Sequence, residues 1–172
     1  DDYSGQDYGT SIATDAVGNV YVAGYTHSLN NIATSGAYQT SLKGDEDAFL
    51  VKFNSNGIRL WGTYYGGEGS DRPLGIAIDV NGNVYLSGYT TSTSDIATTG
   101  AHQTTIAGYI DAFIVKFNSD GARQWATYYG GSGDEYGNSI AVDISGNVIV
   151  CGNTDSYTGL NDNAIATSGA YQ

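Results

Sequence analysis

Short runs of alternating apolar and polar residues, separated by turn-forming residues, make up most of the chain. Ile76 and Ile78 alternate with Ala77 and Asp79, and after the sequence D-V-N-G-N the pattern resumes with apolar residues at 84 and 86. Alternation with a period of two indicates β-strands, and an Asp and a Gly at these places suit a tight turn. A second hairpin is predicted from 48–53 and 59–65. No stretch has a helical period long enough to compete, so the sequence predicts an all-β protein.

The same pattern returns with a period of 64 residues. The segment 44–67, GDEDAFLVKFNSNGIRLWGTYYGG, recurs as 108–131 with 17 of 24 positions identical. The other hairpin occurs three times, beginning at Ile12, Ile76 and Ile140. Each unit therefore contains four predicted strands, and a fixed period of this length is typical of repeat architectures.

Both faces of the predicted strands carry apolar or small residues, as in A-F-L-V at 48–51 and I-A-V at 140–142. A sheet buried on both faces needs neighbours on both sides, which radially packed blades provide. A sandwich would show a cleaner inward and outward alternation. The sequence therefore predicts a β-propeller of four-stranded blades, with blade 1 at 7–67, blade 2 at 71–131 and the first half of blade 3 at 135–172.

The length of the chain bears on closure of the ring. Propellers close with about 4–8 blades, and four blades of this size need about 256 residues. The 172 residues hold about two and a half blades, and both ends carry the same half-blade, so identical copies do not complete one another. We therefore expect an incomplete ring that is a piece of a longer chain.

Three ordered motifs carry a family resemblance: D-x-x-G-N-V-Y-[VL]-[AS]-G, then D-A-F-[LI]-V-K-F-N-S-[ND]-G, then W-x-T-Y-Y-G-G. Together they resemble the SBBP family of β-propeller repeats, found in secreted and cell-surface bacterial proteins, and the resemblance covers essentially the whole chain. It implies a β-propeller, an extracellular or cell-surface location, and a binding or surface-structural role. The third copy departs from the pattern at Ile149 and Asn153, which replace tyrosines, and at an insertion around 155–162.

Charge and composition exclude several partners. Six basic residues face eighteen acidic ones, giving a net charge of −12, which repels phosphate backbones and anionic lipid heads. No run of apolar residues is long enough to span a bilayer, so neither nucleic acid nor membrane insertion is expected. The single Cys151 can form no internal disulfide. It aligns with Ala23 and Ser87, which predicts a buried small residue rather than a nucleophile.

The sequence shows no active site. His27 and His102 lack a second His or Cys at ligand spacing, and no Ser/His/Asp order or phosphate-binding glycine loop is present. Residues that recur in every copy are better explained by structure. Asp15, Asp79 and Asp143 are predicted to form turns, Trp61 and Trp125 to pack between blades, and Lys52 and Lys116 to be exposed at a hairpin end.

Calcium is the one cofactor that the residues suggest. The segment 66–71, GGEGSD, matches the start of a calcium-binding nonapeptide, but its next copy lies 64 residues away, so a link between blades explains it better. A looser site remains open, because clustered carboxylates suit a hard cation. Its candidate ligands are the acidic residues of two loops, Asp45, Glu46, Asp134 and Glu135. Solvated surface charge is the alternative.

The segments that vary between copies are candidates for binding, because repeat scaffolds keep packing residues fixed and vary loops. They are 27–30, 91–95 and 155–163, together with 43–46 against 107–110. Ser, Thr, Asn and Tyr predominate there, which suits a carbohydrate or a protein partner but also any solvated loop. The candidate ligand-binding residues are His27, Tyr109, Asp155 and Tyr157.

These observations favour a noncatalytic module for adhesion or recognition, partnered by the rest of its own propeller and by surface glycans or proteins. One alternative is the scaffold of a glycan lyase or hydrolase whose catalytic residues lie outside this segment. Another is a structural spacer in a large surface assembly. Propellers host all of these functions, so the fold alone does not choose between them.

Overall fold

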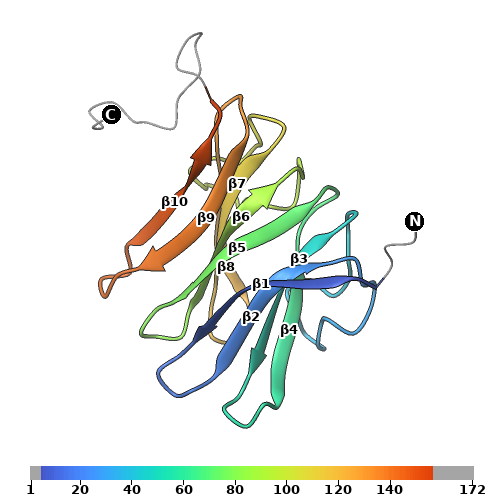
Figure 1. Ribbon diagram of the computed structural model, residues 1–172, viewed down its shortest axis with the longest axis vertical. Coiled ribbons are helices and arrows are strands. Elements are labelled where there is room, and N and C mark those ends of the chain that lie inside the picture. The colour runs from blue at the N-terminus through green and yellow to red at the C-terminus, as the bar shows by residue number, and fades with distance from the viewer. Residues whose placement is uncertain (1–4, 157–172) are drawn as a thin grey trace.

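The computed structural model describes residues 5–156, and within them the chain is all β (Figure 1). It forms two four-stranded antiparallel sheets and one two-stranded sheet. Blade 1 consists of β1 (Asp7–Thr14), β2 (Val20–Thr26), β3 (Asp47–Phe53) and β4 (Arg59–Tyr65). Blade 2 consists of β5 (Asp71–Ile78), β6 (Val84–Thr90), β7 (Asp111–Phe117) and β8 (Arg123–Tyr129). Half-blade 3 consists of β9 (Glu135–Val142) and β10 (Val148–Thr154).

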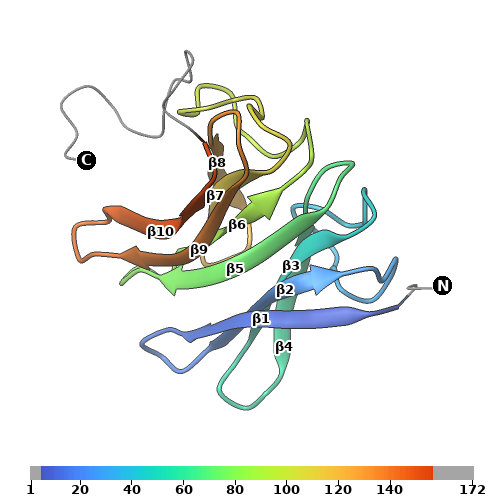
Figure 2. The same ribbon diagram turned by 45° about the horizontal axis from the view of Figure 1, so that its top comes forward.

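The three sheets are arranged around one side of an axis, as blades are in a propeller. The first strands lie next to one another, β1 against β5 and β5 against β9, while β4 and β8 form outer edges (Figures 1 and 2). Strand order in each full sheet follows the chain. The predicted β-propeller is thus confirmed, as about two and a half blades that do not close a ring. No helix long and apolar enough to cross a membrane is found between residues 5 and 156.

The turn between β5 and β6 is built around Asp79. Its carboxylate accepts hydrogen bonds from the Asn81 and Asn83 backbone N–H groups, both at 2.9 Å, and from the Tyr85 hydroxyl at 3.0 Å. Burial alone would raise the pKa of Asp79, but these bonds and one from the Asn83 side chain lower it. Gly82 adopts the left-handed conformation, with φ of 77°. The equivalent turns repeat this pattern around Asp15 and Asp143, which confirms the predicted role.

The core between blades 1 and 2 is filled by β7. Phe113 and Phe117 place their rings 5.4 and 5.8 Å from the ring of Tyr65 on β4, measured between centroids. Tyr65 is fully buried and donates its hydroxyl to the backbone oxygen of Ile96 at 3.1 Å. Burying a phenylalanine side chain contributes about 1.5–3 kcal/mol, so this apolar contact stabilises the packing of the two blades.

Polar contacts reinforce the same junction. Trp61 and Lys52 both donate to the backbone oxygen of Ser119, each at 3.1 Å, in the turn between β7 and β8. The prediction that Trp61 packs between blades is confirmed. The prediction of an exposed Lys52 is wrong: it is 8% exposed, because its stem lies between the blades and its ammonium sits 5.0 Å from the Tyr21 ring centre.

The environment of Cys151 also differs from expectation. Its repeat equivalents Ala23 and Ser87 are fully buried, whereas Cys151 on β10 is exposed. In blades 1 and 2, the next blade covers the face of the sheet on which these residues lie. Among residues 5–156, no further sheet covers the same face of β10. The prediction that Cys151 is buried is therefore wrong, although its equivalents in blades 1 and 2 are buried.

Candidate functional site

The variable segments enter or leave the blades at one common end, which we call the loop face. At this end β2, β6 and β10 finish and β3 and β7 begin, as the pairs Thr26–Asp47 and Thr90–Asp111 show. The loop face comprises residues 27–28, 43–46, 91–92, 107–110 and 155–156, with the linkers 66–70 and 130–134. The opposite end of each blade carries the tight turns described above. The loop face is therefore where chemistry can vary without altering the sheets.

An ionic cluster occupies the loop face between blades 1 and 2. The carboxylate of Glu46, only 3% exposed, accepts hydrogen bonds from Nε and Nη2 of Arg72, the latter at 3.0 Å. His27 Nε2 lies 3.3 Å from the same carboxylate, and its Nδ1 lies 2.9 Å from the Asp45 backbone oxygen. The Arg72 guanidinium also lies 4.3 Å from the centre of the Tyr25 ring. Burial alone would lower the pKa of Arg72, but its hydrogen bonds to Glu46 and the charge of that carboxylate raise it.

The equivalent place between blade 2 and half-blade 3 has different chemistry on the same backbone. Ile110 stands where Glu46 does, and Tyr136 where Arg72 does. Tyr136 meets the ring of Tyr89 edge to face, with centroids 5.0 Å apart. The backbone bond from Asp71 N–H to the oxygen of Glu46, 3.0 Å long, recurs from Glu135 to Ile110 at 2.9 Å. An ionic junction has thus become an aromatic one without a change in the chain path.

A buried carboxylate begins the inner strand of each following blade. Asp71 accepts bonds from the Gly67 N–H and the Ser92 hydroxyl, both at 2.8 Å, and from Thr90. Burial raises the pKa of Asp71 to about 6, although these hydrogen bonds oppose the rise. The carboxylate of Asp47 lies on the other side of Gly66. A Cβ atom added to this glycine would fall within 3 Å of the carboxylates of both Asp71 and Asp47. A charge at Asp47 also raises the pKa of Asp71.

Glu135 holds the position of Asp71 in half-blade 3. Its carboxylate accepts hydrogen bonds from the Gly131 N–H and the Thr154 hydroxyl, both at 2.8 Å, and from Ser156 at 2.6 Å. Like the carboxylate of Asp71, that of Glu135 has its hydrogen-bonding capacity satisfied by neutral donors of the protein. These bonds join the start of β9 to the end of β10 and to the linker before β9.

The structure does not bring the four candidate calcium ligands together. Asp45 and Glu46 lie at the first junction, and Asp134 and Glu135 at the second. Glu46 directs both oxygens at Arg72, whereas Glu135 binds hydroxyl and amide groups. Within residues 5–156, no three His, Cys, Asp or Glu side chains are grouped as metal ligands. Calcium binding stays an untested prediction.

The candidate ligand-binding residues are divided between the same two junctions. His27 belongs to the ionic cluster, while Tyr109 at the second junction is 76% exposed. Asp155 is exposed and donates its backbone N–H to the Asp134 oxygen at 3.0 Å. Tyr157 lies outside the described residues. Tyr109 and Asp155 are thus the predicted residues that present their side chains to solvent.

Arg72 is the residue of this site that the sequence interpretation missed. Its signal was a pair of departures from the repeat: Glu46 becomes Ile110 and Arg72 becomes Tyr136 at the same step. Other positions, among them Asp45 and Asn56, change at the same step, so this pair does not stand out in the sequence.

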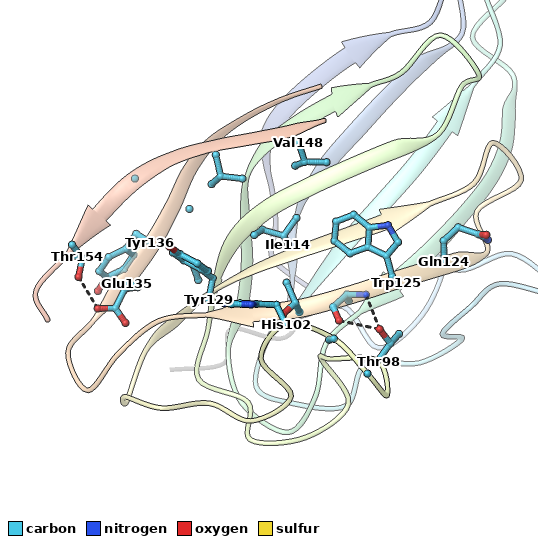
Figure 3. A pocket seen from close by; sticks show the side chains of 18 of the residues that line it. Thr98, His102, Ile114, Gln124, Trp125, Tyr129, Glu135, Tyr136, Val148 and Thr154 are labelled. Carbon is cyan, nitrogen blue, oxygen red and sulfur yellow. Dashed lines mark hydrogen bonds between the residues drawn. The ribbon is translucent and has the colours of Figure 1, made fainter. Parts of the chain in front are cut away.

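An apolar cavity of about 900 Å³ lies beside the second junction, between blade 2 and half-blade 3 (Figure 3). Ile114 and Trp125 form one wall, and Val148 and Val150 form the other. Towards the loop face, the cavity reaches His102, whose ring stacks on Tyr129 with centroids 5.9 Å apart, and the bond from Thr154 to Glu135. Apolar atoms make up most of its exposed lining.

Comparison with known proteins agrees with this architecture. The SBBP family, described as a β-propeller repeat, matches residues 2–33, 60–95 and 124–161. An uncharacterized WD repeat-containing protein, L264 of Acanthamoeba polyphaga mimivirus, is 29% identical over 131 residues, which are 62% of this chain and 9% of that protein. The regulatory protein FlaEY of Caulobacter vibrioides is 32% identical over 135 residues, 75% of this chain and 13% of FlaEY. The chain therefore spans a small part of each relative's length.

Proposed function

Because the chain belongs to the SBBP family of β-propeller repeats, we propose that it is a noncatalytic recognition module that binds a carbohydrate or a protein through its loop face. In this proposal the module serves adhesion or recognition within a secreted or cell-surface protein. The location rests on the resemblance of its motifs to repeats of secreted and surface proteins.

The observation that carries the proposal is the difference between the two junctions of the loop face. Both have the same backbone hydrogen bonds, yet one holds the Glu46–Arg72 ion pair and the other holds Ile110 and Tyr136. The opposite end of the blades keeps its Asp-centred turn in all three copies. Variation of the loops at one end of a conserved scaffold is typical of a binding surface.

Tyr109 is the residue best placed to contact a ligand. It is 76% exposed and lies on the loop face, directly before Ile110 of the second junction. A tyrosine offers a flat apolar face and a hydroxyl at little entropic cost, which suits sugars and protein surfaces alike.

The test is binding of the fluorescently labelled chain to a glycan array and to immobilised surface proteins. For a ligand so found, Tyr109→Ala should weaken binding by about tenfold, because the loss of one aromatic anchor costs more than 1 kcal/mol. Val80→Ala is the matched control: it is 77% exposed but lies at the opposite end of blade 2, and should bind as the parent does.

Three outcomes would contradict the proposal. Equal loss in both variants would place binding elsewhere, and no binding to any glycan or protein would favour a structural spacer. Release of a smaller product from a bound glycan, detected by mass spectrometry, would favour an enzyme.

A further inference from the structure

Two turns at the end of the blades opposite the loop face contain an asparagine followed by a glycine. Asn56 and Gly57 lie between β3 and β4, and Asn81 and Gly82 lie between β5 and β6. Both asparagines are exposed, so water reaches their side chains. An asparagine in this setting can lose its amide group, because the backbone nitrogen of the next residue attacks its Cγ atom, and a following glycine has no side chain to hinder that attack.

The reaction needs no enzyme and no co-reactant other than water. The glycine N–H gives up its proton, the N–Cγ bond forms, and the Cγ–Nδ2 bond breaks, so that the side-chain nitrogen leaves as ammonia. The result is a cyclic imide that includes both residues. Water then opens the imide at one of its two carbonyl groups. The product is aspartate or isoaspartate, and in the latter the backbone runs through Cβ and Cγ.

The backbones of the two turns are alike. Gly57 donates its N–H to the backbone oxygen of Asn54 at 2.9 Å, and its φ is 76°. In the other turn, Gly82 donates in the same way to Asp79 at 3.0 Å, and its φ is 77°. The attacking nitrogen must leave the same hydrogen bond in either turn. The backbone therefore does not distinguish the two asparagines.

The side chain that caps each turn does distinguish them. In the first turn, the neutral amide oxygen of Asn54 accepts hydrogen bonds from the N–H groups before and after Gly57, both at 3.0 Å. In the second turn, the carboxylate of Asp79 accepts them from the N–H groups before and after Gly82, both at 2.9 Å. Although burial raises it, hydrogen bonds lower the pKa of Asp79, so this carboxylate is charged at neutral pH.

A negative charge beside the glycine nitrogen opposes the reaction. Loss of the N–H proton and attack on Cγ both place negative charge next to the capping side chain. Repulsion between two unit charges about 5 Å apart in water slows such a step about fourfold. Each turn also lies beside a second turn with an acidic residue, Asp15 in one case and Asp120 in the other, so these neighbours do not reverse the order.

The second repeat shows that the fold accepts an acid at this place. Asp120 stands at the position of Asn56 and is followed by Gly121. Asp120 donates its N–H to the side chain of Asn118, and Gly121 donates to the Asn118 backbone oxygen, both at 3.0 Å, as in the first copy. Aspartate formed in the first copy would therefore keep the turn, whereas isoaspartate, with its longer backbone, would break these hydrogen bonds.

We propose that Asn56 is a site of spontaneous deamidation, and that Asp79 protects Asn81 from the same reaction. The modification adds a negative charge to the turn of blade 1, at the end opposite the loop face. It is therefore a property separate from the proposed ligand binding, and neither depends on the other.

The test incubates the complete 172-residue chain at neutral pH and follows both sites by peptide mapping with tandem mass spectrometry, which detects the mass gain of an amide converted to an acid. Asn56 should react about fourfold faster than Asn81. An isoaspartyl methyltransferase assay measures the isoaspartate formed. Asn56→Gln should abolish the gain at that position, because the longer side chain does not readily form the cyclic imide.

Exchange of the capping residues locates the cause. Asn54→Asp gives the first turn the cap of the second and should slow the reaction at Asn56 about fourfold. Asp79→Asn is the reverse exchange and should speed the reaction at Asn81 by about the same factor. Asp143→Asn is the matched control: it changes the equivalent carboxylate of half-blade 3, where no asparagine precedes the glycine, and should leave both rates unchanged.

Three results would overturn the proposal. One is equal rates at Asn56 and Asn81. Another is an Asn54→Asp or Asp79→Asn variant that is folded by circular dichroism and reacts at the rates of the parent. The third is no mass gain at Asn56 under conditions that convert a synthetic peptide of residues 53–59, because the folded turn would then prevent the attack.

Discussion

Trp61 donates its indole N–H to the backbone oxygen of Ser119, 3.1 Å away, and so joins the outer strand of blade 1 to the turn of blade 2. The indole ring also packs on Gly121 of the same turn. We predict that Trp61→Phe lowers the free energy of unfolding by about 1–2 kcal/mol, because it loses the hydrogen bond and part of the ring contact. Urea denaturation measures the change.

The chain contains its own control for that substitution. Trp125 stands at the equivalent position and contacts Tyr85 as Trp61 contacts Tyr21, but its indole N–H meets no acceptor within residues 5–156. Trp125→Phe should therefore cost less than Trp61→Phe by about 1 kcal/mol. Equal costs would show that the Ser119 contact contributes nothing to stability.

Asp71 should make the stability of the chain depend on pH. Its pKa is raised by burial from the usual 3.8 to about 6, so the folded state holds the proton more tightly than the unfolded state. Its contribution is fully present below about pH 4 and is lost as the pH rises through 6. Asp71→Asn removes this loss. The unfolding free energy of the variant, relative to the parent, should rise between pH 4 and pH 7 by at most about 3 kcal/mol.

The control for the pH prediction is Asp120→Asn, which changes a carboxylate on an exposed turn. Its difference from the parent should stay nearly constant over the same range. Chemical denaturation at half-unit pH steps measures both variants. A flat difference for Asp71→Asn would mean that Asp71 is ionised throughout the range in the folded chain.

Glu46 and Arg72 can be replaced by isoleucine and tyrosine, the residues at the equivalent positions of the second junction. Arg72→Tyr alone should destabilise the chain by about 2 kcal/mol, because it strands the Glu46 carboxylate, which is 3% exposed, without its guanidinium. Arg72 itself is 36% exposed, so solvent reduces the cost. Adding Glu46→Ile should restore most of the loss, since Ile110 and Tyr136 coexist in the second junction.

A double-mutant cycle measures this coupling between the two sites. Additive losses in the single and double variants would show that the ion pair and the apolar pair are not interchangeable solutions at this junction.

The sequence predicted local and periodic features well. The turns around Asp79 depend on residues no more than six apart, so their chemistry is visible in a short window. The strands and blade order follow from a repeat in which 17 of 24 positions are identical across one segment. Propensity, periodicity and turn residues all indicated the same structure there.

Contacts between blades were harder to predict. Glu46 was a candidate calcium ligand, with solvated surface charge as the alternative, yet it pairs with Arg72, 26 positions away on the next blade. Lys52 was expected in solvent, yet it binds Ser119, 67 positions away. A single copy of the repeat contains neither partner, so its pattern cannot show that these side chains are paired.

The two different junctions also give the blades an order. A nearly exact repeat can dock the wrong units together while it folds, because their surfaces are alike. Were half-blade 3 to dock directly on blade 1, Glu46 would face Tyr136 and be buried without a positive charge, whereas Arg72 satisfies it in the native arrangement. The ion pair is thus a contact that only blades 1 and 2 make, and its loss penalises an assembly in which half-blade 3 takes the place of blade 2.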